Sequence, residues 1–419
     1  MSRIYTGKYY FYFECYTCIK TTETCALILN TFDNQKIISS DKRIIALIEK
    51  MIAKKNSVLE IDFDNFYKDD LYQSFFDEVR NKYMGDLIDV KLSKGEPVNF
   101  YPIPKVEDNI RKKEKQDKSI DFNFLCNSLF NLTLFLNTAC RHNCPHCKDY
   151  GKQFHCCTKF SCKDACNSID SEIIEEIFNY ARFENLNRIH LLGGDISLYK
   201  ELDWLFNYLS GYQENCYAYF KYDNIRSINA KMLSFFDNRI VIIADAAAID
   251  RRDVDILIND YNRFEIHIIV TDELQLEKIA TLADSSVSYK LIPYYNGKNR
   301  SFFENHIYLN EEDIFETQYT IKKIHKNQLM NSFFFGNLTV LPDGNVCIAM
   351  NSPVLGNLKN ESIFEILSKA LKNEDSLWFK TRNTAATCSG CLFVDLCPPI
   401  SDYELATGKS NLCHVKNEE

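Results

Sequence analysis

Residues 132–147 read LTLFLNTACRHNCPHC and join a strand-like apolar run to three closely spaced cysteines. The run at 132–136 has the length and apolar character of a buried strand. Cys140, Cys144 and Cys147 follow it with the spacing C-x3-C-x2-C. They would lie on the loop that leaves the C-terminal end of a strand, where α/β barrels build their active sites.

Three thiolates are an incomplete ligand set for a 4Fe-4S cluster. Such a cluster takes one ligand per iron, so three cysteines leave one iron open to another molecule. Zinc is the first alternative, because it accepts three thiolates and an imidazole, here from His142 or His146. Free thiols without metal are the second. The spacing and the position after a strand favour the cluster.

This motif resembles the cluster loop of the radical S-adenosylmethionine (radical SAM) enzymes. In that family the open iron chelates the amino and carboxylate groups of S-adenosylmethionine. The reduced cluster then splits the cofactor, giving a 5′-deoxyadenosyl radical. The resemblance implies this chemistry at Cys140, Cys144 and Cys147.

A glycine pair follows the second strand expected in this region. Gly193, Gly194 and Asp195 resemble the Gly-Gly-Glu segment that holds the cofactor's amino group in the same family. Glycine lets the backbone approach a ligand, and a carboxylate can accept a hydrogen bond from an ammonium. Aspartate is one methylene shorter than glutamate. The resemblance implies that Gly193, Gly194, Asp195 and His146 bind S-adenosylmethionine; a simple turn is the alternative for the glycines.

Composition limits the class of protein. The chain has 419 residues, 46% hydrophobic and 13% aromatic, enough for buried cores and two or three domains. It shows no apolar run of about 18 residues and no secretory signal, so we expect a cytoplasmic protein that does not enter membranes. In a reducing cytosol, 17 cysteines indicate metal ligands and free thiols. A net charge of −9 argues against nonspecific nucleic-acid binding.

Residues 1–95 combine short apolar strands with amphipathic helices. We expect strands at 9–19, 25–30 and 37–38, a hairpin over 27–38, and helices at 41–54 and 71–82. This order resembles the small α+β, winged-helix-like module with which many peptide-modifying enzymes bind a leader peptide as an added strand. A structural cap is the alternative. Cys15 and Cys18 would point to opposite faces of one strand and make poor co-ligands.

Residues 96–125, with prolines and the charged run RKKEK at 111–115, have the composition of a linker. Residues 126–310 then alternate strands with helices. Strands are expected near Leu132, Ile189, Tyr217, Ile240, Ile266 and Tyr289, and helices at 171–183, 202–209 and 253–261. Six such units predict an α/β fold with a parallel sheet. The partial (β/α)6, TIM-like barrel of radical SAM enzymes has this form. Asp245 and Arg252 are weaker site candidates.

A second cysteine group lies near the C-terminus. Cys388, Cys391 and Cys397 are spaced C-x2-C-x5-C, and Cys413 lies sixteen residues beyond. Four thiolates saturate a 4Fe-4S cluster. With the segments 341–346 and 355–358 and a helix expected at 362–371, residues 311–419 resemble the cysteine-rich SPASM or twitch-like extension of radical SAM peptide maturases. A zinc ribbon is the alternative.

That extension commonly holds two auxiliary clusters, and this chain departs from the pattern. Ser401 and Ala349 stand where cysteines of the first auxiliary cluster are expected, and Cys347 is out of register. We therefore expect one auxiliary 4Fe-4S cluster, held by Cys388, Cys391, Cys397 and Cys413. A closed cluster would transfer electrons or act as a structural staple.

Four further cysteines follow the cluster loop: Cys156, Cys157, Cys162 and Cys166. Adjacent cysteines rarely serve one ion, so we interpret the segment as a thiol-rich loop beside the active site. The alternative is that one thiol contacts substrate or a further metal.

The resemblances together imply a radical SAM enzyme that modifies a ribosomally made precursor peptide bound through residues 1–95. Hydrogen abstraction would lead to a thioether, a C–C or C–O crosslink, or an epimerised residue. The cofactors would be S-adenosylmethionine and two 4Fe-4S clusters, with flavodoxin or ferredoxin as electron donor. One alternative is oxidation of another protein, as in anaerobic sulfatase maturases; another is a catalytically inactive peptide-binding partner.

Overall fold

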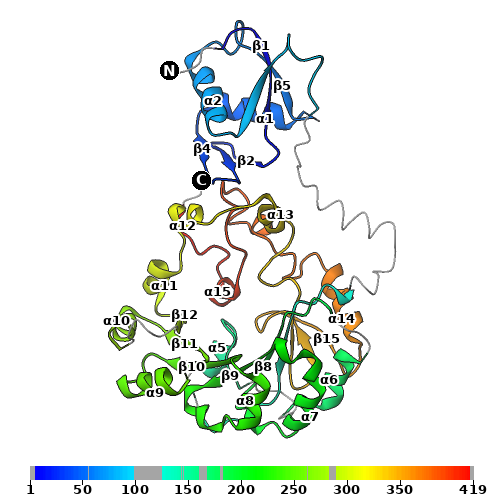
Figure 1. Ribbon diagram of the computed structural model, residues 1–419, viewed down its shortest axis with the longest axis vertical. Helices are drawn as coiled ribbons and strands as arrows, with labels where there is room; N and C mark the ends of the chain where they lie inside the picture. Colours follow the sequence, from blue (N-terminus) through cyan, green and yellow to red (C-terminus); the bar gives the residue numbers. More distant parts are fainter. Residues whose placement is uncertain are drawn as a thin grey trace.

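The computed structural model describes residues 5–54, 56–98, 125–142, 144, 146–159, 168–179, 183–261, 263–282 and 289–415. Most of the expected linker, with its charged run, lies outside these residues, as do Cys162 and Cys166. The described residues form a small N-terminal module and a larger body that contains the main sheet (Figure 1).

The N-terminal module contains two small antiparallel sheets and two helices. One sheet has the order β5-β1-β6, from β1 (Lys8–Phe13), β5 (Val58–Asp62) and β6 (Gly85–Asp89). The other has the order β2-β3-β4, from β2 (Thr17–Thr21), β3 (Ala26–Asn30) and β4 (Lys36–Ser39). The two expected helices are present as α1 (Lys42–Ile52) and α2 (Asp70–Asn81).

The predicted first strand is wrong in one respect. Residues 9–19 fall into two strands of different sheets, because the chain turns after β1, with Thr17 N donating to Glu14 O at 2.9 Å. Cys15 therefore lies in the turn, and only Cys18 lies in a strand. The strands β5 and β6 were not predicted. Gly85 permits the β6 pairing, since a Cβ there would lie 2.4 Å from Tyr12 O.

The body is built on a nine-stranded sheet with the order β12-β11-β10-β9-β8-β7-β13-β14-β15. Its parallel strands are β7 (Asn131–Phe135), β8 (Arg188–Leu192), β9 (Cys216–Lys221), β10 (Ile240–Asp245), β11 (Glu265–Val270) and β12 (Tyr289–Pro293). These are the six predicted strands, and the α/β, partial-barrel prediction is confirmed.

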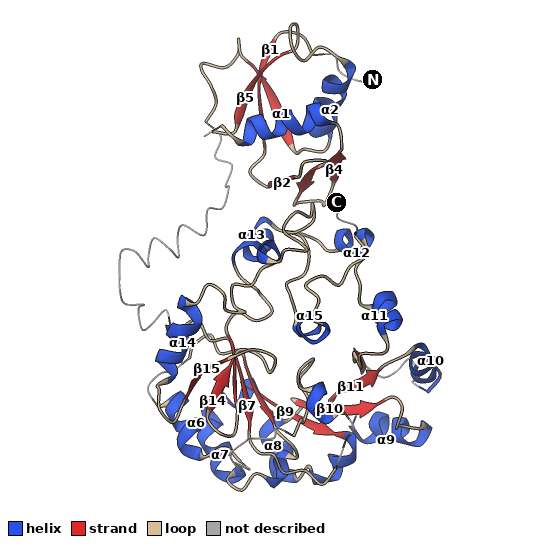
Figure 2. Cartoon of the chain, turned by 180° about the vertical axis from the view of Figure 1, so that it is seen from behind, coloured by secondary structure: helices blue, strands red, loops and turns tan. Residues whose placement is uncertain are grey.

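Helices between these strands lie on the outer side of the sheet (Figure 1, Figure 2). They are α6 (Ser171–Phe178), α7 (Leu202–Tyr208), α8 (Ala230–Phe236), α9 (Arg251–Tyr261) and α10 (Glu273–Leu282). Strand residues that face them, such as Leu134 and Ile242, are fully buried. The alternate strand residues therefore face the concave side, and the strand ends define one rim.

The sheet continues past the expected barrel boundary at residue 310. β13 (Asn337–Val340) runs parallel to β7, with Leu338 opposite Leu132, and β14 (Asn345–Cys347) and β15 (Val354–Asn357) extend it antiparallel. The remaining helices are α5 (Cys147–Tyr150), α11 (Arg300–His306), α12 (Glu311–Glu316), α13 (Ile321–Leu329), α14 (Ile363–Lys372) and α15 (Asp402–Thr407).

The N-terminal module packs against the C-terminal segment. Leu27 and Leu29 of β3 are buried in one cluster with Tyr319 and Phe393. The Asn34 side chain donates to Thr317 O at 2.9 Å and accepts from Tyr319 N at 3.2 Å. Figure 1 shows the strands β2 and β4 beside α12 and α13. The N-terminal module thus packs in a defined position against the segment that carries the second cysteine group.

Among the described residues, we find no helix with the length and apolar character needed to cross a bilayer.

Candidate metal and cofactor sites

The first three cysteines lie on the loop after β7, and Cys147 begins α5. Backbone N–H groups of His142 and Lys159 donate to the sulfurs of Cys140 and Cys147, at 3.4 and 3.1 Å. The Asn224 side-chain amide lies 3.8 Å from Cys140 Sγ. Donors aimed at sulfur favour the thiolate, which is the form that binds metal.

The thiols of this loop influence one another, which shows that the fold gathers them. Burial raises the pKa of Cys144 to about 11, and Cys157 and Cys147 add to the rise. The Lys221 ammonium opposes it. Burial also raises the pKa of Cys147, with a smaller contribution from Cys140. The site therefore joins several thiols to nearby positive charges, from Lys221 at Cys144 and from Lys159 at Cys147.

Lys221 is the last residue of β9, and sequence reasoning missed it. Its ammonium forms an ion pair with Asp245 at the end of β10, and the two side chains are only 6% and 22% exposed. Tyr150 donates to the same carboxylate at 2.9 Å. A lysine that ends the apolar strand CYAYFK was the available signal. Asp245 thus lies beside the thiols, whereas Arg252 is exposed on α9.

The glycine pair fixes the cluster loop to the end of β8. Gly193 and Gly194 have φ of 101° and 58°. A Cβ on Gly193 would lie 2.6 Å from Asn137 O, and one on Gly194 would lie 2.1 Å from Ala139 O. Asp195 N donates to Ala139 O at 2.7 Å. The two glycines are therefore required for close packing of the loop that carries Cys140.

Replacing Gly194 with alanine should displace this loop. The added Cβ meets a backbone oxygen and the left-handed φ disfavours alanine, so we expect a loss of about 3 kcal/mol in unfolding free energy. Gly211→Ala is the matched control, because nothing lies within 4 Å of a Cβ there. Thermal unfolding and metal content after reconstitution would check this. Equal values for both variants would contradict the packing argument.

Asp195 is engaged by its own chain. Its carboxylate accepts from Ser197 N at 3.0 Å, from Ser197 Oγ at 2.6 Å and from Ser227 Oγ at 3.3 Å, and the residue is 3% exposed. It therefore holds the segment after the glycines in place. His146, which precedes α5, lies against Tyr294 with ring centroids 5.2 Å apart.

Two polar atoms beside the glycine pair are buried and have no hydrogen-bond partner among the residues that the structure describes. They are Asn137 Oδ1 and Thr158 Oγ1. Asn137 Nδ2 donates to Asp195 O at 3.1 Å, and Gly194 N donates to Thr158 O at 3.1 Å, so both residues contact the glycine segment. Unpaired buried acceptors and donors next to grouped thiols fit a site built for a polar ligand.

A cavity of about 790 Å³ lies on the concave side of the sheet. His155 and His190 stack within it at 4.0 Å between ring centroids, and His190 Nδ1 lies 2.8 Å from Tyr219 Oη. His155 is exposed where it lines the cavity, and desolvation by the surrounding atoms first, and the Arg188 charge second, lower its pKa to about 4. Burial likewise depresses the pKa of His190. Both imidazoles are therefore neutral at physiological pH.

Cys156 and Cys157 are buried with Phe135 and Leu192 beside this cavity. A hydrogen bond with Cys156, followed by burial, raises the pKa of Cys157 well above that of a free thiol. Cys157 is therefore a protonated core residue of the inner barrel, with Cys156 buried beside it.

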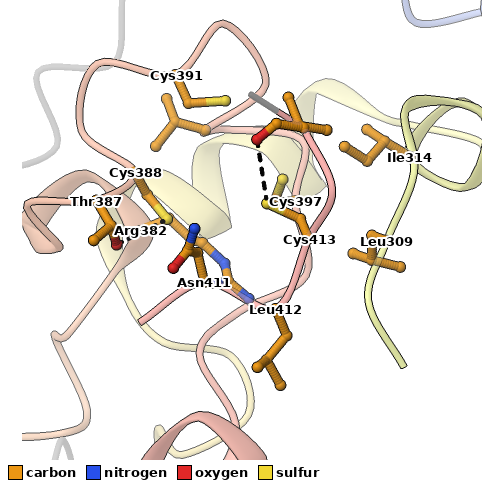
Figure 3. A pocket seen from close by; sticks show the side chains of 12 residues that line it. Leu309, Ile314, Arg382, Thr387, Cys388, Cys391, Cys397, Asn411, Leu412 and Cys413 are labelled. Atoms are coloured by element: carbon orange, nitrogen blue, oxygen red, sulfur yellow. Dashed lines mark hydrogen bonds between the residues drawn. The ribbon is translucent and has the colours of Figure 1, made fainter. Parts of the chain in front are cut away.

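The four C-terminal cysteines surround one pocket (Figure 3). Burial raises the pKa of Cys397 to about 12, Arg382 lowers it, and Cys391, Cys413 and Cys388 raise it. Arg382 donates to Pro398 O and Ser410 O, each at 2.7 Å, and pairs with Glu404 of α15. The fold thus brings the four predicted cysteines to one pocket, and the Arg382 guanidinium lies beside them.

Within the described ranges, no three His, Cys, Asp or Glu side chains converge closely enough to hold a single metal ion. A 4Fe-4S cube holds its thiolates farther apart than a single zinc ion does, because each thiolate binds a different iron.

The residues that depart from the cysteine pattern of the first auxiliary cluster have structural roles or line the cavity. Ser401 caps α15, with Oγ and N bonded to Glu404. Ala349 lines the 790 Å³ cavity. Cys347 is buried in β14, and burial raises its pKa to about 12.

No family model matches this chain, and no curated protein matches it. Among solved structures, Streptococcus suis SuiB bound to the precursor peptide SuiA matches with 10% identity and a TM-score of 0.43. SuiB bound to S-adenosylmethionine matches with 10% identity and a TM-score of 0.40. Both alignments cover 97% of this chain and 99% of the SuiB chain.

Proposed function

We propose that this protein is a radical SAM enzyme that modifies a ribosomally made precursor peptide. The observation that carries the proposal is the gathering of Cys140, Cys144 and Cys147 at the C-terminal rim of a parallel sheet, with three N–H donors on two of the sulfurs. A three-cysteine 4Fe-4S cluster with bound S-adenosylmethionine supplies a 5′-deoxyadenosyl radical that takes a hydrogen atom from substrate.

The residues around the loop fit such a ligand. Gly193 and Gly194 leave room for the loop where a Cβ would clash with it. Asn137 and Thr158 offer polar atoms without a partner among the described residues, and Lys221 places a positive charge by the thiolates. A thiolate-held, negatively charged group is stabilised by such a charge. His146 and Tyr294 would line the mouth of the site, where they help to exclude water.

The second site would hold a closed 4Fe-4S cluster on Cys388, Cys391, Cys397 and Cys413. The Arg382 guanidinium lies close to these thiols. Its hydrogen bonds to the backbone carbonyls of Pro398 and Ser410 fix its position there. We assign this site to electron transfer, because four thiolates leave no position for substrate. Metal analysis of the protein would distinguish a zinc ion at this site from a 4Fe-4S cluster.

The precursor peptide would bind through the N-terminal module. Among the described strands β4 pairs with β3 alone and is thus an edge strand, and its Ile38 is 41% exposed. A groove of about 960 Å³ runs beside Ile38 and the β2–β3 turn, and Cys391 and Phe393 form its other wall. Edge strands accept peptides through main-chain hydrogen bonds. Peptide held here would lie next to the segment that carries the second cysteine group.

The deciding experiment is anaerobic reconstitution with iron and sulfide, followed by incubation with S-adenosylmethionine, a strong reductant such as dithionite, and the peptide encoded beside the gene. We expect about eight irons per chain, four per cube, release of 5′-deoxyadenosine, and a mass change in the peptide. Bound zinc without cofactor cleavage would refute the proposal. Cleavage without a change in the peptide would refute only the choice of substrate.

A further inference from the structure

The first turn of α15 is fixed from both sides at the wall of the barrel cavity. Tyr403 Oη donates to Pro293 O at the end of β12, at 2.8 Å. Glu404 bonds Ser401 and pairs with Arg382, and it is 4% exposed. In Figure 1, α15 lies between the main sheet and the helices α12 and α13. These contacts hold the turn without using Asp402.

Asp402 lines the cavity from this fixed turn, together with Ser401 and Tyr403. Its side chain is half-buried, and in the part of the chain that the structure describes its carboxylate forms no hydrogen bond or ion pair. The other carboxylate of the cavity, Glu265, is already paired with His267 at 2.6 Å. Asp402 is therefore the unpartnered acid of this cavity.

The charged and titratable groups that share the cavity come from several elements. They are Arg188 and His190 on β8, Tyr217 and Tyr219 on β9, Glu265 and His267 on β11, Lys290 on β12, and His155 on the loop after α5. On its own helix, Asp402 interacts electrostatically with Glu404 and Tyr403. Burial first, and Glu404 second, raise the pKa of Asp402 to about 7. A group with such a pKa can both accept and release a proton at neutral pH.

We propose that Asp402 is a catalytic residue that accepts a proton from the peptide residue held in the cavity. Its carboxylate oxygen takes the proton of an O–H, S–H or N–H group on that residue. The substrate atom keeps the bonding electron pair and becomes the anion, and Asp402 becomes the neutral acid, so charge and atoms balance. The proposal rests on the proposed function, because it requires peptide in the barrel.

The first test uses the full chain without added ligand. The pKa of Asp402 is raised in the folded state, so its contribution to stability is present below about pH 4 and is lost as pH rises to about 7. Asp402→Asn should remove this loss. We expect its melting temperature to rise relative to wild type between pH 4 and 7 and to stay parallel above pH 7. Parallel curves throughout would show that Asp402 does not titrate there and would overturn the proposal.

The second test measures peptide modification by reconstituted enzyme. Asp402→Asn should lower the kcat for product formation by about 100-fold, as for loss of a general base, with KM for the peptide within about twofold. The fall of wild-type kcat below pH 7 should be absent in this variant, and Asp402→Glu should restore part of the rate. Asp203→Asn, on the exposed surface of α7, is the control.

The outcomes separate the two proposals. Product formation by Asp402→Asn within threefold of wild type would overturn the role of Asp402 while leaving the proposed function intact. A wild-type enzyme that releases no 5′-deoxyadenosine would overturn both. A melting temperature for Asp402→Asn below that of wild type at every pH would assign Asp402 a structural role instead.

Discussion

Cys144→Ala should abolish cofactor cleavage. Under the proposed function the fourth iron of the cube would bind S-adenosylmethionine, and the two remaining thiolates could not hold that cube. We therefore expect release of 5′-deoxyadenosine to fall by at least about 1,000-fold. Iron should fall from about eight to about four per chain, because the C-terminal cysteines form a separate pocket with its own four thiols. Iron and sulfide assays with chromatography of the nucleoside would measure both changes.

The matched control is Cys15→Ala. Cys15 is exposed in the turn between β1 and β2, so its loss should leave the iron content and the cleavage rate unchanged. Cys397→Ala completes the comparison, since it should remove about four irons from the second site only. Cofactor cleavage by Cys144→Ala at the wild-type rate would refute the assignment of the first site. Loss of all iron in Cys144→Ala would refute the independence of the two sites.

The parallel sheet and the two cysteine groups could be predicted from sequence because local signals specify them. Strands such as β10 are continuous apolar runs, and β7 leads directly into the cysteine spacing. The strand β6 was missed because Gly85 makes its pairing with β1 possible, and a glycine at a close approach gives no apolar signal. β13 was missed because its partner, β7, lies about 200 residues earlier in the chain.

Sequence reasoning singled out the cysteines of the candidate site and missed several side chains around them. Lys221, His190 and Asp402 come from strands or helices whose sequences read as ordinary core or cap segments. Their positions become informative only in the folded chain, which brings His190 and Asp402 to one cavity and places Lys221 near Cys144. Asp195 shows the converse: its motif was recognised, but Ser197 and Ser227 occupy its carboxylate.

Lys221→Met should destabilise the protein more than most single changes in the barrel. The variant leaves Asp245 half-buried with Tyr150 as its one hydrogen-bond donor among the described residues, at 2.9 Å. Removing one member of a buried ion pair costs about 3–5 kcal/mol, because the remaining charge is uncompensated. Chemical denaturation of the protein before reconstitution would measure this loss.

The double variant Lys221→Met with Asp245→Asn separates stability from function. It removes both charges and keeps an oxygen that can accept from Tyr150, so we expect it to recover most of the lost unfolding free energy. Metal loading should not recover, because Lys221 is the cation that opposes the raised pKa of Cys144. Recovery of both properties would show that Lys221 serves only to balance Asp245. Recovery of stability alone would show that Lys221 is needed for metal binding by the thiolates. The ion pair with Asp245 would then serve to stabilise the buried ammonium of Lys221 next to them.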